Sequence, residues 1–143
     1  MIDMPTLADG PAGRRAVNAP LLADIIWKSH GGHAFVEFVG ARPGEGAVGA
    51  FSFGRARGAI EGVLAAAGIP ATLITSPSWK RAIGIPPGKV GAKDAARSEA
   101  IRRWPDKAHL FARVKDDGRA EAALIAVAGL LRLRSIEGGA DGR

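Results

Sequence analysis

The stretch AFVEFVGARPGEGAVGAFSFGRARGAIEGVLAAAGIPATLIT, residues 34–75, decides the fold class. Its first six residues are apolar except for Glu37, and ATLIT at 71–75 is a second short apolar run. The lengths of both runs and the glycines around them favour buried strands. Between them, residues 52–67 carry small and apolar side chains that predict a helix, which Gly68 ends. Strand, helix and strand in this order predict an α/β layer fold with a largely parallel core.

Helices are predicted on both sides of this segment. Asn18 is suited to cap a helix that continues to the glycines after His30. Residues 92–104 predict an amphipathic helix with a basic face. The helix predicted from about 117 to 133 is apolar on nearly all sides, which favours burial. We expect one domain over residues 1–134, with residues 135–143 as a flexible tail.

The remaining segments give weaker signals. Residues 1–4 are suited to end a strand that Pro5 stops, and residues 8–17 are predicted to form a loop. Ser76 or Ser78 is expected to cap a short helix. Core or helix anchors are favoured over base-stacking platforms for Trp27, Trp79 and Trp104. Phe51 and Phe53 are interpreted either as core residues, which is favoured, or as a wedge that holds a junction open.

The charge balance favours a polyanionic partner. The chain has 143 residues, 20 Lys and Arg against 14 Asp and Glu, and a net charge of +6. A basic protein binds nucleic acid by releasing counterions from phosphates, although a soluble protein that is merely basic remains the alternative. The absence of Cys excludes disulfides and Cys-ligated zinc. No signal peptide or membrane span is evident, so we expect a cytoplasmic protein that does not enter the membrane.

Glu37 is an unusual residue for its position. A carboxylate inside an apolar strand is costly to bury without a partner. It is either a salt-bridged structural residue or a functional one, and the strand pattern alone favours neither interpretation.

The run KDDGRAEAALIA, residues 115–126, places further acids at the start of a helix. Asp117 and Glu121 are four residues apart and share one face, where two like charges repel unless a cation lies between them. The positive end of the helix dipole is a sufficient reason for Asp116 and Asp117, but it explains Glu121 less well. Oxygen ligands of this kind suit Mg²⁺ or Mn²⁺, and two such ions can hydrolyse a phosphodiester.

Basic residues are clustered after the predicted strands. Any single one of them is more simply explained as part of a solvated face. Their position is nevertheless significant, because ligands of α/β sheets bind at the carboxyl ends of the strands. The candidate DNA-binding residues are Arg55, Arg57, Lys80, Arg81, Lys89, Lys93 and Arg97.

Taken in order, these motifs resemble the RuvC-like Holliday-junction resolvases of the ribonuclease-H-like superfamily, particularly phage-type members. HAFVEFVGARPGEG with FSFGRARGAIEGVLAAAGIP resembles catalytic-core segments of the family. ITSPSWKRAIGIPPGK with AKDAAR resembles its basic strand-and-loop segment, and KDDGRAEAALIA resembles its C-terminal acidic helix. The resemblance covers roughly residues 1–133.

The resemblance implies a ribonuclease-H-like fold with a mixed sheet flanked by helices, a homodimer, and Mg²⁺-dependent nicking of four-way junctions. Glu37 matches a metal-binding acid and Glu121 the last acid. Asp117 takes the place of another acid, with Asp116 as a substitute. Lys80 and Lys93 match basic residues that approach the scissile backbone. The small-residue helix around Gly58 and Gly62 is implied to form the dimer interface.

The sequence departs from the family at two places. Members begin with a strand that carries an Asp in an Asp-Pro-Gly-like context, and no such strand is found here, so the N-terminal strands are expected to be missing or incomplete. That strand lies in the centre of the family's sheet, and without it the sheet has unpaired edges. Many cellular members also place an aromatic wedge three residues after the strand Glu, where this chain has Gly40.

Two functions follow as hypotheses. The first is a structure-specific endonuclease that resolves four-way junctions by two-metal hydrolysis, with Glu37, Asp117 and Glu121 as metal ligands and Lys80 or Lys93 steadying phosphate charge. The missing Asp is then expected from an upstream segment. The second is a catalytically inactive module that binds branched DNA, which is a degenerate or truncated resolvase.

Overall fold

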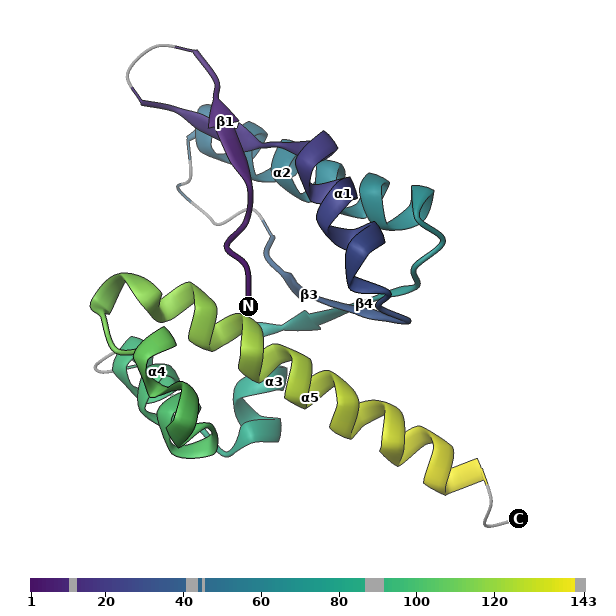
Figure 1. The fold of residues 1–143 in the computed structure, drawn as a ribbon, viewed down its shortest axis with the longest axis vertical. Coiled ribbons are helices and arrows are strands. Elements are labelled where there is room, and N and C mark those ends of the chain that lie inside the picture. The colour runs from purple at the N-terminus through teal and green to yellow at the C-terminus, as the bar shows by residue number, and fades with distance from the viewer. Residues whose placement is uncertain (11–12, 41–43, 45, 87–91, 141–143) are drawn as a thin grey trace. The chain divides into compact units, whose positions relative to one another are not determined.

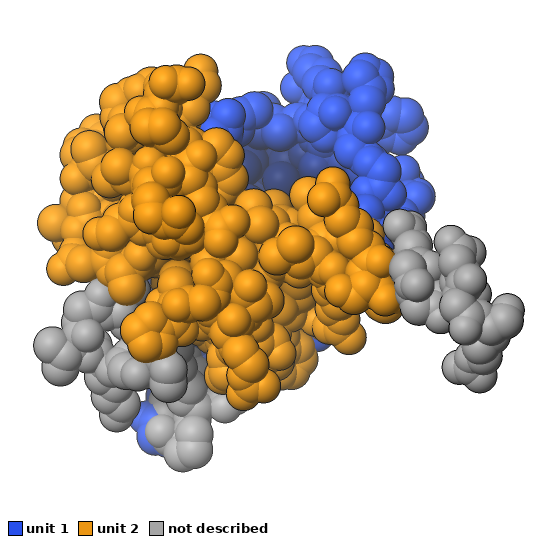
Figure 2. All heavy atoms as spheres, turned by 90° about the horizontal axis from the view of Figure 1, so that it is seen from below, with its two compact units in different colours: residues 1–34, 39–72 blue, residues 35–38, 73–143 orange. Residues whose placement is uncertain are grey.

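The computed structural model describes residues 1–10, 13–40, 44, 46–86 and 92–140, without the side chains of 92–93 and 137–140. Figure 1 shows the elements, which are in chain order β1 (Thr6–Ala8), β2 (Arg15–Val17), α1 (Ala19–Ser29), β3 (Ala34–Phe38), α2 (Ala47–Ala66), β4 (Ala71–Thr75), α3 (Ser76–Ile83), α4 (Ala92–Arg103), the 3₁₀ helices η1 (Pro105–Leu110) and η2 (Val114–Asp116), and α5 (Asp117–Ala140). The chain divides into two compact units, coloured separately in Figure 2. Unit 1 comprises Met1–Ala34 and Val39–Thr72, and unit 2 comprises Phe35–Phe38 and Leu73–Arg143.

The N-terminal part of unit 1 is a hairpin. β1 pairs antiparallel with β2, and the turn between them uses Gly10 and Gly13, which both have positive φ. The predicted strand at residues 1–4 is therefore wrong, because the chain is extended after Pro5 rather than before it. The predicted loop at 8–17 is too long, because Ala8 and Arg15–Val17 belong to the two strands. Three-residue strands are too short to show alternation of apolar and polar residues in the sequence.

Two helices complete unit 1. The Asn18 side chain accepts a hydrogen bond from the Leu21 N–H, which confirms the predicted helix cap. α1 packs against α2. α2 begins at Ala47, five residues before its predicted start. Phe51 and Phe53 on this helix are 69% and 57% exposed, so their interpretation as core residues is wrong.

Trp27 on α1 is also exposed, whereas Trp79 on α3 is fully buried, as expected of a core anchor. Trp104 is half-buried and packs against the core of unit 2. α3 begins after an N-cap residue, Thr75, that makes no side-chain cap bond, so neither Ser76 nor Ser78 is the cap.

The strands β3 and β4 pair in a second sheet, as the opening sequence predicts. The Ala34 N–H donates to the Pro70 carbonyl where both strands begin, at 2.9 Å. Both strands run in the same direction in Figure 1, with α2 between them in the chain. The α/β class is therefore confirmed. The described residues form two separate two-stranded sheets, however, and not one mixed sheet.

The main core belongs to unit 2, where α3, α4 and α5 pack together. Its buried residues are Ile74, Trp79, Ile83, Ile85, Ala96, Leu124, Ile125 and Ala128. A second cluster of Ala100, Phe111 and Ala120 joins α4 to the start of α5. These contacts hold α3 and the first turns of α5 in place, and both segments carry predicted site residues.

α5 begins at the predicted residue but differs from the prediction in two ways. It continues through Ala140, past the predicted end at 133. It also buries one side only, because Leu130 and Leu131 are 52% and 43% exposed. None of the described helices is long and apolar enough to cross a membrane.

We expect Gly129→Ala to lower the free energy of unfolding by about 1–2 kcal/mol. A Cβ at Gly129 would lie 2.2 Å from Phe35 Cδ1. Overpacking costs about 1–3 kcal/mol, and the better helix propensity of Ala offsets about 1 kcal/mol of that. Urea denaturation measures the change. Gly118→Ala, on the same helix with open space around it, is the control. Equal effects of the two variants would contradict the close packing of α5 on β3.

Candidate functional site

Glu37 is held on β3 by a hydrogen bond from α3. The indole Nε1 of Trp79 donates to Glu37 Oε1 at 3.1 Å. Glu37 is half-buried, and Trp79 is fully buried in the core of unit 2. The bond satisfies both a carboxylate in an apolar strand and an indole N–H that burial would otherwise leave unpaired. Trp79 therefore fixes the position of the Glu37 carboxylate.

Sequence analysis missed this contact, although two signals indicate it. An apolar strand with one carboxylate needs a donor, and a buried Trp needs an acceptor. The pairing is not evident in the sequence, because Glu37 and Trp79 are 42 positions apart.

The same tryptophan contacts the first basic residue of α3. Lys80 Nζ lies 5.3 Å from the centroid of the Trp79 ring, within the range of a cation–π interaction. The structure therefore brings together two of the predicted site residues, Glu37 and Lys80, through a residue that they share. Arg81 follows on α3 and is exposed.

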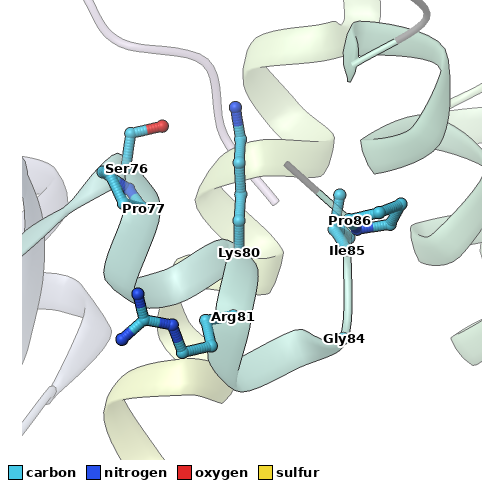
Figure 3. A pocket seen from close by; sticks show the side chains of 7 residues that line it. All are labelled: Ser76, Pro77, Lys80, Arg81, Gly84, Ile85 and Pro86. Atoms are coloured by element: carbon cyan, nitrogen blue, oxygen red, sulfur yellow. The ribbon is translucent and has the colours of Figure 1, made fainter. Parts of the chain in front are cut away.

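Lys80 and Arg81 border a cavity of ≈ 480 Å³, shown in Figure 3. Its lining residues come from α3 and the segment directly after it: Ser76, Pro77, Lys80, Arg81, Gly84, Ile85 and Pro86. No ion pair joins either cation to an acid within the described part of the chain. Both positive charges are therefore available to a ligand.

The other predicted DNA-binding arginines are paired within the chain. Arg55 forms an ion pair with Asp9 in unit 1. In the same unit, Arg57 Nε lies 2.7 Å from Glu61 Oε1. Arg97 pairs with Asp94 in unit 2 and donates to the Ala112 carbonyl at 3.1 Å. Lys89 and the side chain of Lys93 lie outside the described residues. Lys80 and Arg81 are therefore the strongest of the candidates that the structure describes.

Asp116 is engaged by two arginines. It is 2% exposed, and its oxygens accept hydrogen bonds from the Arg113 backbone N–H and guanidinium at 2.8–3.0 Å. Arg119 Nη1 lies 3.6 Å from Asp116 Oδ1. The hydrogen bond from the Arg113 side chain is the main reason that the pKa of Asp116 falls to about 2. Asp116 is thus suited to join η2 to α5 rather than to bind a metal.

Asp117 and Glu121 begin α5 and are both half-buried. Asp117 Oδ1 accepts a hydrogen bond from the Gly118 N–H at 2.9 Å, which is a local contact at the helix start. In Figure 1, β3 and β4 run toward the side on which the N-terminal half of α5 lies. Within the described residues, however, no group of three or more His, Asp or Glu side chains could hold a metal ion. The described carboxylates therefore do not fit a two-metal centre in this arrangement, and we derive no chemical step through one.

Acidification is expected to destabilise the protein as pH falls from about 4 to about 2. The pKa of Asp116 is about 2 in the folded chain and about 3.9 in an unfolded one. A lowered pKa contributes stability that is complete above the unfolded value and is lost as pH falls through the folded value. The pKa of Glu99 is lowered to about 2 as well, mainly by its hydrogen bond from Arg102.

Asp116→Asn should therefore be less stable at pH 7 and should lose less stability on acidification. Urea denaturation at pH 7 and pH 3 measures both effects. Asp106→Asn, at an exposed position on η1, should keep the pH dependence of the unaltered protein. An Asp116→Asn variant with that same dependence would show that the arginine contacts do not lower the pKa.

Comparison with models of known protein families gives no match for this chain, and none of the curated proteins matches it. Any assignment of function therefore depends on the residues and their geometry.

Proposed function

We propose that this chain acts on four-way DNA junctions as a RuvC-like endonuclease. The observation that carries the proposal is the arrangement around Trp79. This residue holds Glu37 on one side and contacts Lys80 on the other, beside a cavity bordered by two unpaired cations. Basic residues on the helix that follows the carboxyl end of β4 suit binding of a phosphodiester backbone.

If the chain binds Mg²⁺ or Mn²⁺, the candidate ligands are Glu37, Asp117 and Glu121, because Asp116 is engaged by its two arginines. Oxygen donors of this type match the preference of both ions. Among the described residues, these three carboxylates do not form a group that could hold a metal ion.

A second candidate is a module that binds branched DNA without cutting it. The pairing of Asp116 with Arg113 and Arg119 favours it, since one of the four predicted acids has a structural role. Both candidates use Lys80 and Arg81 in the same way, so they differ in nicking and not in binding.

The deciding experiment incubates the chain with a labelled four-way junction or matching duplex and Mg²⁺, and records binding and nicking on gels. Symmetric nicks near the crossover support the endonuclease. Junction-selective binding without nicks supports the second candidate. A folded chain that neither binds nor nicks the junction would overturn both. Binding should weaken steeply with salt, because phosphate contacts release counterions.

The proposal includes a homodimer that forms through α2. Gly54, Gly58 and Gly62 are exposed, and a Cβ at each would meet open space. They recur every four residues and so share one helix face, with Phe51 exposed beside them. Small residues let two helix backbones approach closely.

Gly58→Leu should raise the dimer dissociation constant at least about tenfold, because overpacking an interface costs about 1–3 kcal/mol. Sedimentation equilibrium measures the constant. Ser52→Leu, at an exposed position on another side of α2, is the control and should leave it unchanged. A Gly58→Leu variant that dimerises normally would show that this face is not the interface.

A further inference from the structure

The cavity beside α3 has a fixed shape. Gly84 has φ +83 and ends the helix. The Ile85 N–H donates to the Lys80 carbonyl at 2.9 Å, and the Gly84 N–H donates to the Arg81 carbonyl at 3.1 Å. These two bonds are the pair that defines a Schellman motif. They turn the chain back so that Ile85 and Pro86 face the helix, and the cavity therefore exists before any ligand binds.

The cavity has apolar walls and a cationic side. Figure 3 shows Lys80 between Pro77 on one side and Ile85 with Pro86 on the other, while Arg81 extends on the side of Pro77. Ile85 is 7% exposed and belongs to the core, so its wall is rigid. A phosphate alone would use the cations and leave these apolar walls uncovered.

The size and chemistry match a single nucleotide. A cavity of ≈ 480 Å³ falls within the range of small-ligand sites. A planar base packs well against proline rings, and proline is among the residues that proteins insert against unstacked bases. Arginine can stack on the face of a base. In duplex DNA the bases are stacked and inaccessible to such a cavity. Where strands exchange at a junction, a base can leave the stack.

We propose that this cavity binds one unstacked nucleotide of a DNA strand, with the base against the apolar walls of the cavity and the phosphate on Lys80 and Arg81. The inference rests on the proposed function for its substrate. It adds a site that binds a base released from the stack. Such a site would select branched DNA over duplex, because extracting a base costs least where stacking is already broken.

The test is nuclear magnetic resonance of the ¹⁵N-labelled full chain, titrated separately with thymidine 5′-monophosphate and inorganic phosphate. We expect thymidine 5′-monophosphate to shift the amides of Ser76, Lys80, Arg81, Gly84 and Ile85 at several-fold lower concentration than phosphate. Pro77→Ala combined with Pro86→Ala should abolish that difference, since both prolines are exposed and their loss leaves the core intact. Arg81→Gln should weaken both ligands, and Arg134→Gln, an equal charge change on α5, should weaken neither.

A four-way junction with 2-aminopurine at each position beside the crossover supplies the second measurement. Fluorescence should rise several-fold at one position when the unaltered chain binds, and it should not rise with the double proline variant. Equal shifts with thymidine 5′-monophosphate and phosphate, or no shifts at these amides, would overturn the base-binding site. Junction binding without such shifts would leave the proposed function standing. Nucleotide shifts without junction binding would overturn the proposed function and leave the nucleotide site.

Discussion

Glu37→Gln should lower the rate of Mg²⁺-dependent junction nicking by at least about a hundredfold. Substitution of residues that only orient metal ligands already costs about 10- to 100-fold, and the proposal makes Glu37 a ligand itself. Glutamine keeps the size of the side chain, and its carbonyl oxygen can still accept the hydrogen bond that Trp79 donates to Oε1. The variant should therefore fold, and its junction affinity should change little.

The measurement is the single-turnover nicking rate at saturating protein, with junction affinity taken from the same gels. Glu61→Gln is a matched control, because Glu61 pairs with Arg57 on α2 and has no assigned role in cleavage. It should nick at the rate of the unaltered chain. An unchanged nicking rate in Glu37→Gln would remove Glu37 from the site, and β3 would then contribute no ligand to it.

The α/β class and most helices of this fold could be predicted from the sequence. Residues 71–75 were predicted as a strand with the observed bounds, and α5 begins where Asp117 indicated. These predictions succeed because caps, glycine stops and apolar runs act locally. The β1–β2 hairpin was not predicted, because its strands have three residues each and their pairing depends more on a glycine turn than on the side-chain pattern.

Exposure was harder to predict than secondary structure. Phe51 and Phe53 are of a type that is often buried, yet both are exposed on α2. A sequence indicates which side chains favour burial, but burial also depends on which surfaces come together. Phe51 lies beside the glycine face that we propose as the dimer interface, and a second copy would bury surface of this kind.

The candidate site was predicted in part. Residue type and position correctly placed Glu37 on a strand and Lys80 directly after the next strand. Asp116 lies three residues from Arg113 and three from Arg119, and this spacing is visible in the sequence. The burial of Asp116, which strengthens both contacts, cannot be seen there. Trp79 was predicted as a core residue, and only the three-dimensional structure shows that it also joins Glu37 to Lys80.

Trp79→Ala should lower the free energy of unfolding by about 3–5 kcal/mol, the usual cost of removing a buried aromatic side chain. Trp79 is 0% exposed and lies in the core with Ile83 and Leu124. Trp79→Phe should cost less, about 1–3 kcal/mol, because the ring still packs and the main loss is the donor to Glu37. Urea denaturation of both variants separates packing from hydrogen bonding.

A double-mutant cycle of Trp79→Phe and Glu37→Gln measures how much the charge of Glu37 strengthens this hydrogen bond. A hydrogen bond to a charged acceptor is stronger than one to a neutral acceptor, so the cost of Trp79→Phe should be smaller in the Glu37→Gln background. A positive coupling would show that the indole N–H stabilises the charged carboxylate that the proposed nuclease needs. Equal costs of Trp79→Phe in both backgrounds would show that the charge of Glu37 adds nothing to the hydrogen bond from Trp79.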